Sequence, residues 1–266
     1  MGLFDKIKKK SKDTKDCGDK SSVRRVSIFD TDYPLDRNDW EQVYSACAGP
    51  MIVIQKAFAE QVVKERNWFY DFGEGTIRFG ADVYPMQFIG SEAESSGTWM
   101  WGWHNINGFD EKLLRLANEI KEIGTKWKYD VLTTECFNLD EDFNGHNLSM
   151  VACALSKENY CYYRCPHDHG AVFAAVCGVP DNVFAPVSAH DFIIRTVECI
   201  GQLPVNHRIL VESLLMWNGT PYEWEDDVIT AHFNTDVRIG FEKSGDVFRV
   251  SGITAKTLNG VEFYDC

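Results

Sequence analysis

The chain has 266 residues, and 44% of them are hydrophobic, which is enough to bury a core and excludes a disordered chain. Its 27 Lys and Arg stand against 40 Asp and Glu, a formal net charge of −13, and this acidity argues against nucleic acid because it repels phosphate. No apolar run approaches the roughly 18 residues of a membrane span, and we predict a cytoplasmic protein.

The first 25 residues differ in charge from the rest. They hold nine Lys or Arg and four Asp or Glu, a net of +5, which leaves 18 basic and 36 acidic residues, a net of −18. We expect residues 1–30 to form a mobile basic tail, with membrane-surface docking of Leu3, Phe4 and Ile7 as the alternative. The acidic body favours a basic protein as partner, although acidity also simply keeps proteins soluble.

The nine cysteines are scattered from Cys17 to Cys266 with no paired spacing, and their number is odd. This pattern does not predict an oxidised, disulfide-stapled scaffold, and it fits a reducing cytosol.

Residues 39–66 have the pattern of a helical region. Asp39 is a suitable N-cap, with Gln42 at the capping-box position. Gly49-Pro50 is expected to divide the region, because Pro50 suits the first position of a second helix over residues 51–64.

A β-region follows, and its last strand, residues 98–104, carries three tryptophans with a period of two. Trp99, Trp101 and Trp103 would therefore leave one face, either to pack in the core or to form an exposed platform that stacks bases or sugars. The acidic body favours the core. The preceding strands are predicted at residues 68–70, 76–79 (joined by a hairpin turn at 73–75) and 83–89.

A helix is predicted over residues 110–123, with Gly124 as its C-cap. Its apolar stripe of Leu113, Leu114, Ala117 and Ile120 is expected to cover the tryptophan face, since a strand and the next helix usually pack together. Strands are then predicted at residues 128–137, 150–155, 160–164 and 171–177.

A turn-rich link at residues 179–186 is the predicted domain boundary, between a domain over 36–178 and a C-terminal region over 186–266. The order of elements predicts an α+β fold, an antiparallel sheet packed with helices, plus a C-terminal α+β extension. The C-terminal elements are predicted as helices over 188–200 and 204–217, followed by strands over 228–233, 237–242 and 247–253.

The tryptophan strand in its context resembles a known family. Trp68 to Phe79, Gly90-Ser91, the run Thr98-Trp99-Met100-Trp101-Gly102-Trp103-His104-Asn105 and Tyr163-Arg164 occur in the order found in a bacterial family classed as a domain of unknown function. That family is marked by an aromatic G-S…T-W-x-W-x-W-x-N strand, and the similarity covers roughly residues 39–178. His104 stands where the family more often has a small residue, and the resemblance implies no catalytic assignment.

Residues 140–145 match the first half of a calcium loop, with oxygen ligands at positions 1, 3 and 5 and glycine at position 6. Position 12 falls on Val151, where such a loop needs a bidentate Glu. A polar hairpin turn around Asn144-Gly145 is therefore the preferred interpretation.

Four soft or borderline metal ligands, Cys161, Cys165, His167 and His169, are crowded into nine residues. A zinc site usually needs two separated ligand pairs, so buried cysteines beside a polar turn are the simpler interpretation. The weak catalytic candidates are Cys165, His167 and His169 together with His104 and Asn105 at the end of the tryptophan strand. His104 and Asn105 could equally satisfy loop backbone.

We therefore expect an uncharacterised cytosolic protein that acts by binding, as an immunity-type or accessory interaction protein, with no cofactor. The alternative is an enzyme or metal-binding protein with a pocket lined by Cys and His. No complete catalytic signature favours the enzyme.

Overall fold

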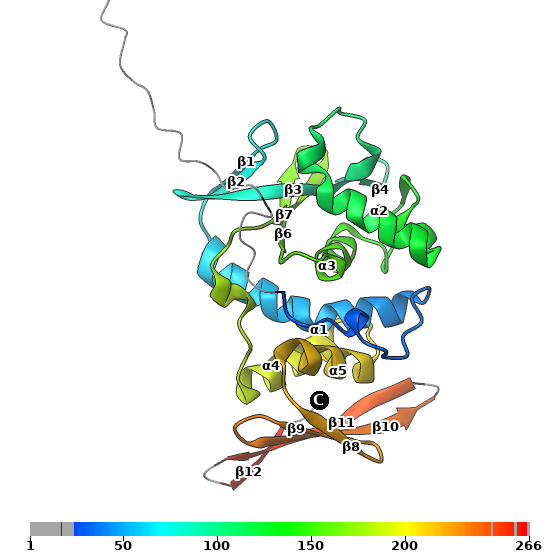
Figure 1. The fold of residues 1–266 in the computed structure, drawn as a ribbon, viewed down its shortest axis with the longest axis vertical. Coiled ribbons are helices and arrows are strands. Elements are labelled where there is room, and N and C mark those ends of the chain that lie inside the picture. The colour runs from blue at the N-terminus through cyan, green and yellow to red at the C-terminus, as the bar shows by residue number, and fades with distance from the viewer. Residues whose placement is uncertain (1–16, 18–23, 246, 258–259, 265–266) are drawn as a thin grey trace, which may run out of the picture.

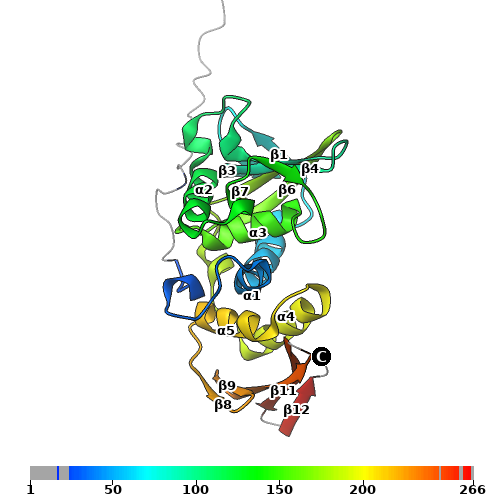
Figure 2. The same ribbon diagram turned by 90° about the vertical axis from the view of Figure 1, so that its right-hand side faces the viewer.

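The computed structural model describes residue 17 and residues 24–245, 247–257 and 260–264, and shows the predicted α+β fold. Figures 1 and 2 show an elongated stack in which one antiparallel sheet lies at each end and the helices lie between them. Within the described residues, no helix combines the length and the apolar character that crossing a membrane requires. The helices are α1 (Trp40–Phe58), α2 (Arg115–Trp127), α3 (Gly145–Leu155), α4 (Ala189–Gln202) and α5 (His207–Asn218).

The first sheet is built around the long strand β3 (Asp82–Ala93). Its first residues pair with β2, and its last residues pair with β4 on one side and β7 on the other, all antiparallel. The predicted hairpin of residues 68–79 is present as the β1–β2 pair. The other strands are β1 (Trp68–Asp71), β2 (Thr76–Phe79), β4 (Thr98–Trp101), β5 (Cys136–Asn138), β6 (Cys161–His167) and β7 (Gly170–Val176).

The second sheet has the order β12-β11-β10-β9-β8, and all its pairs are antiparallel. Ile229, Ile239 and Ile253 are buried on its inner face, and α5 packs against β11. β8 and β12 were not predicted, because neither has a clear apolar alternation. The strands are β8 (Tyr222–Glu225), β9 (Val228–His232), β10 (Asp236–Ser244), β11 (Val247–Thr257) and β12 (Gly260–Tyr264).

Helix α1 runs through Pro50 without a break, so the prediction of two helices is wrong. The Asp39 cap is confirmed, since its carboxylate accepts the Gln42 N–H. Proline costs an interior helix about 3 kcal/mol, but burial of the side chains on both sides of Pro50 outweighs that cost. Gly49 serves the packing of α1 on α5, because a Cβ there would lie 2.8 Å from the Leu210 carbonyl oxygen.

The tryptophan strand ends at Trp101, and residues 102–104 form the 3-10 turn η3 (Gly102–His104). Trp99 and Trp101 are fully buried with their rings edge to face at 5.3 Å, which confirms the core interpretation. Trp103 does not continue their face. It is buried beneath the Lys121 ammonium, which lies 4.0 Å from its ring centroid.

Helix α2 begins and ends later than predicted. Residues 111–113 form the 3-10 turn η4 (Glu111–Leu113), and α2 continues past Gly124 to Trp127, where Lys128 is the left-handed C-cap. The predicted stripe is buried, and α2 packs against β3 and η3. Gly124 allows close packing, since a Cβ there would lie 2.5 Å from the Leu132 side chain.

Two predicted strands are wrong. Residues 128–137 hold the 3-10 turn η5 (Asp130–Leu132) and contribute only the start of β5. Residues 150–155 belong to α3, whose apolar side chains are buried on several sides, so the short apolar run did not distinguish helix from strand. The remaining short helices are η1 (Ile28–Asp30), the π-helical η2 (Ala59–Val63) and η6 (Asp181–Phe184).

The predicted helix over 188–200 is confirmed as α4, with the Ser188 hydroxyl accepting the Asp191 N–H. Pro204 does not open the next helix. α5 begins at His207 because the Asn206 side chain accepts the Ile209 N–H and supplies the N-cap.

Cys17 and Cys177 form a disulfide, so the expectation of unpaired cysteines is wrong for this pair. Their separation of 160 residues gave no paired spacing to detect. Residues 1–16 and 18–23 of the predicted tail lie outside the described residues. Residues 24–30, at its end, contact the body: Ile28 is buried, and the Arg25 guanidinium donates to the Phe184 carbonyl.

Candidate interaction surface

The two candidate cysteines, Cys161 and Cys165, lie on β6 with their side chains fully buried. Burial raises the pKa of both thiols, that of Cys165 to about 12, so neither is an activated nucleophile. His167 and His169 are exposed where β6 turns into β7, and the His169 N–H donates to the His167 ring at 3.2 Å.

The candidate residues do not converge. His167 pairs with Gly170, Gly170 with Ala93, and Ala93 with Thr98, so the His167 end of β6 lies beside the start of β4. His104 follows the other end of β4, beyond the row in which Trp101 pairs with Gly90. The structure therefore separates His104 and Asn105 from the Cys165–His169 group by the length of the sheet.

Asn105 satisfies loop backbone, as the simpler interpretation expected. It has a left-handed conformation, and its side chain both donates to and accepts from the backbone of Phe109. The His104 ring lies 3.7 Å from the Glu135 carboxylate at the protein surface.

The calcium-like segment forms the N-terminus of α3 and not a hairpin turn. The Asn144 side chain accepts the Asn147 N–H as the N-cap, and the Asp140 carboxylate accepts the Asp142 and Phe143 N–H groups. In the part of the chain that the structure describes, no three His, Cys, Asp or Glu side chains are grouped so that they could hold a metal ion.

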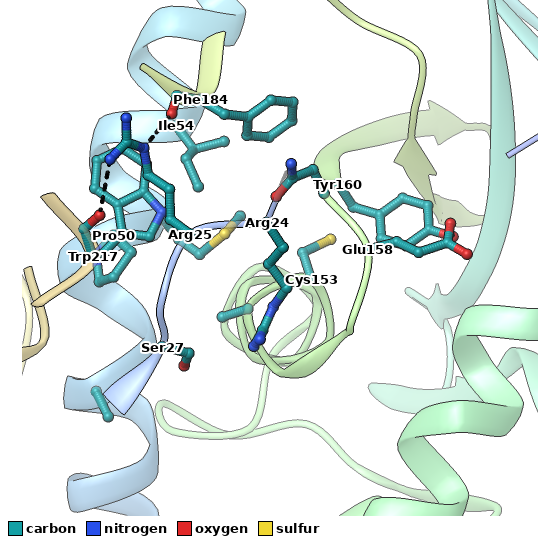
Figure 3. A pocket seen from close by; sticks show the side chains of 14 residues that line it. Arg24, Arg25, Ser27, Pro50, Ile54, Cys153, Glu158, Tyr160, Phe184 and Trp217 are labelled. Atoms are coloured by element: carbon teal, nitrogen blue, oxygen red, sulfur yellow. Dashed lines mark hydrogen bonds between the residues drawn. The ribbon is translucent and has the colours of Figure 1, made fainter. Parts of the chain in front are cut away.

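A small pocket lies where the N-terminal segment meets α1, α3 and α5 (Figure 3). Arg25 lines it and is held by hydrogen bonds to the carbonyls of Phe184 (2.8 Å) and Trp217 (3.5 Å). Its guanidinium also lies over the Trp217 ring, and burial lowers its pKa. The pocket encloses about 40 Å³, which is room for about three water molecules. It therefore serves as an anchor for the segment and is too small for an organic substrate.

The most unusual surface lies on the outer side of β1, β2 and β3. Phe69 is 62% exposed on the edge strand β1, and Val83 on β3 is 40% exposed. Phe69 pairs with Arg78, which pairs with Val83, so the three side chains form one row across the sheet. We call this surface the β1–β3 face and define it by Phe69, Asp71, Arg78 and Val83.

The opposite side of β1 is held rigidly by aromatic rings. Trp68 stacks on Tyr70 at 6.2 Å and meets Tyr163 of β6 edge to face at 5.7 Å. Tyr70 in turn contacts Phe72, which packs on Phe109 at 4.5 Å. These half-buried rings fix β1 in place, so the exposed Phe69 is carried on an ordered strand.

The surroundings of the β1–β3 face are acidic. Residues 67–101 contain five Asp or Glu and one Arg, a net charge of −4. Asp82 is paired with Arg66 at 2.7 Å, whereas Asp71, Glu74 and Glu94 are exposed. The alternation Trp68-Phe69-Tyr70 was the available sequence signal, because one aromatic must face away from the other two on a strand.

Comparison with known protein families matches residues 41–179 to a family described as a family of unknown function (DUF6882). No curated protein and no solved structure matches the chain.

Proposed function

Since the chain belongs to the family of unknown function DUF6882, we propose that it acts by binding a basic protein through the β1–β3 face. The observation that carries the proposal is the exposure of Phe69 on an ordered edge strand beside exposed Asp71 and Glu74. Exposed apolar side chains rimmed by polar ones mark interaction sites, and aromatic residues supply much of the binding energy there.

The charge of the chain supports the same partner class. The body outside residues 1–25 has a net charge of −18, and such a field attracts a basic protein and speeds its association. The proposed role is that of a bacterial immunity-type or accessory protein, which blocks or assists a basic partner in the cytoplasm. In that reducing compartment the Cys17–Cys177 pair would form its disulfide only under oxidising conditions.

The test is capture of partners from a host lysate on the immobilised full chain, at low and at high salt. Three proteins are compared: the unaltered chain, Phe69→Ser, and the control Val26→Ser, which changes an equally exposed apolar residue (57%) outside the β1–β3 face. We expect a basic protein to be retained by the unaltered chain and by Val26→Ser, to be lost by Phe69→Ser, and to elute as salt rises.

Two results would contradict the proposal. One is the absence of any partner at every ionic strength. The other is a partner that Phe69→Ser retains fully. Circular dichroism of each variant establishes that the exposed substitutions leave the fold intact.

A further inference from the structure

The disulfide fixes where the basic tail starts. Cys17 is bonded to Cys177, whose N–H donates to the Pro85 carbonyl at 3.1 Å, and the Arg115 guanidinium donates to the Cys17 carbonyl. Pro85 lies on β3 two residues after Val83, and it faces the same side of the sheet. The tail is therefore tethered beside the β1–β3 face.

The tail has the chemistry that the β1–β3 face is proposed to recognise. Residues 1–16 contain six Lys and three Asp, and three of their apolar residues are Leu3, Phe4 and Ile7. Sixteen residues can extend up to about 50 Å, so every part of the β1–β3 face lies within reach of the tether.

We propose that residues 1–16 are an intramolecular ligand of the β1–β3 face, with Leu3, Phe4 and Ile7 against Phe69 and Val83 and the lysines beside Asp71 and Glu74. The tail then competes with an external partner for the same surface. This inference rests on the proposed function for the nature of that surface. A short tether gives an effective concentration of the order of millimolar, so even a weak contact is populated.

The disulfide adjusts this competition. A dithiol reductant converts the pair to two thiols while the reductant itself becomes a cyclic disulfide, so two hydrogen atoms pass to the cysteine sulfurs. The tail is then tethered only from Arg24, which pairs with Asp30 at 2.6 Å. The tether between Ile7 and its anchor grows from ten to 17 residues. Effective concentration falls roughly as the −3/2 power of length, so occupancy is expected to fall about two-fold.

The test uses the full chain alone, cross-linked with a carbodiimide that joins lysine amines to carboxylates in direct contact. Mass spectrometry then counts the cross-links from Lys6, Lys8, Lys9, Lys10, Lys12 and Lys15. The reference carboxylates are Glu223 and Glu225 on β8, in the sheet at the other end of the molecule. Two further samples are the reduced chain and a variant with Leu3, Phe4 and Ile7 each changed to Ser.

We expect the oxidised chain to link Asp71 and Glu74 at least five-fold more often than the reference carboxylates. Reduction should lower that excess about two-fold, and the triple-Ser variant should abolish it. Equal linking of both carboxylate groups would overturn the inference, and so would an excess that the triple-Ser variant retains. Because no external partner is present, either failure leaves the proposed function to be decided by the capture experiment.

Discussion

The indole nitrogen of Trp101 donates a hydrogen bond of 2.9 Å to the main-chain carbonyl of Val131. This contact joins the end of the tryptophan strand to the turn that follows α2, two segments 30 residues apart. Trp101 therefore contributes both a large buried ring and a satisfied polar group to the core.

Replacing Trp101 by Ala is expected to lower the free energy of unfolding by about 3–5 kcal/mol, because the ring is fully buried. Trp101→Phe keeps an aromatic ring but loses the Val131 hydrogen bond, so its loss should be smaller. Urea unfolding followed by circular dichroism measures both. A loss below about 1 kcal/mol for Trp101→Ala would contradict its place in the core.

Gly90→Ala is expected to be strongly destabilising, because a Cβ at this position would lie 2.6 Å from the Met100 carbonyl oxygen and against the Trp99 ring. Gly201→Ala is the matched control. It lies in α4 with no atom within 4 Å of its added Cβ, and it should raise stability by up to about 1 kcal/mol. Thermal unfolding of the two variants should shift in opposite directions, and similar shifts would show that the close approach at Gly90 is relaxed.

Stability should depend on pH through His207. Burial and the nearby Arg249 lower its pKa to about 4, and its Nδ1 accepts the Val250 N–H, so the folded chain holds the ring neutral. Above pH 6.5 neither folded nor unfolded chain protonates this ring. As the pH falls toward 4, the unfolded chain takes up the proton and the folded chain does not, so stability is lost, by at most about 3 kcal/mol.

His207→Gln should reduce the loss of unfolding free energy between pH 6.5 and 4, whereas His190→Gln, at an exposed position, should leave it unchanged. Urea unfolding at several pH values gives the slopes. Equal slopes for His207→Gln and the unaltered chain would mean that the ring titrates normally in the folded chain.

The free thiols should differ sharply in reactivity. Cys136 is exposed, whereas Cys47, Cys153, Cys161, Cys165 and Cys199 are buried, and burial raises the pKa of each buried thiol. A maleimide at neutral pH should therefore label Cys136 quickly in the native chain and the other described free cysteines only after denaturation. Cys136→Ser is the control that should remove this rapid labelling. Equally rapid labelling of Cys165 would restore it as a candidate nucleophile.

Local signals in the sequence located the helix starts at Asp39 and Ser188 and the β1–β2 hairpin, because caps and glycine turns act within a few residues. The same reasoning failed at Asn144-Gly145, where a cap was interpreted as a turn. Nothing within six residues told it that Phe173 and Glu92 surround that helix start. Pro50 failed in the same way, because the burial that sustains α1 is tertiary.

The candidate site was less accessible to sequence reasoning. Chemistry-bearing residues such as Cys165 and His167 attracted attention by their type, but their strand register sends one inward and the other outward. Phe69 is an ordinary apolar residue by composition. Its exposure follows from the position of β1 at the sheet edge, which only the strand order reveals.

The close approach of Gly49 to Leu210 has a meaning for the inheritance of this domain. The matched family region ends at residue 179, yet the α1 face inside it is covered by α5, which lies beyond it. A chain that carried only residues 41–179 would present that apolar helix face to water and would need another cover, such as a second subunit. The C-terminal extension is thus a built-in lodger on a surface that ancestors or relatives without it must have filled from elsewhere.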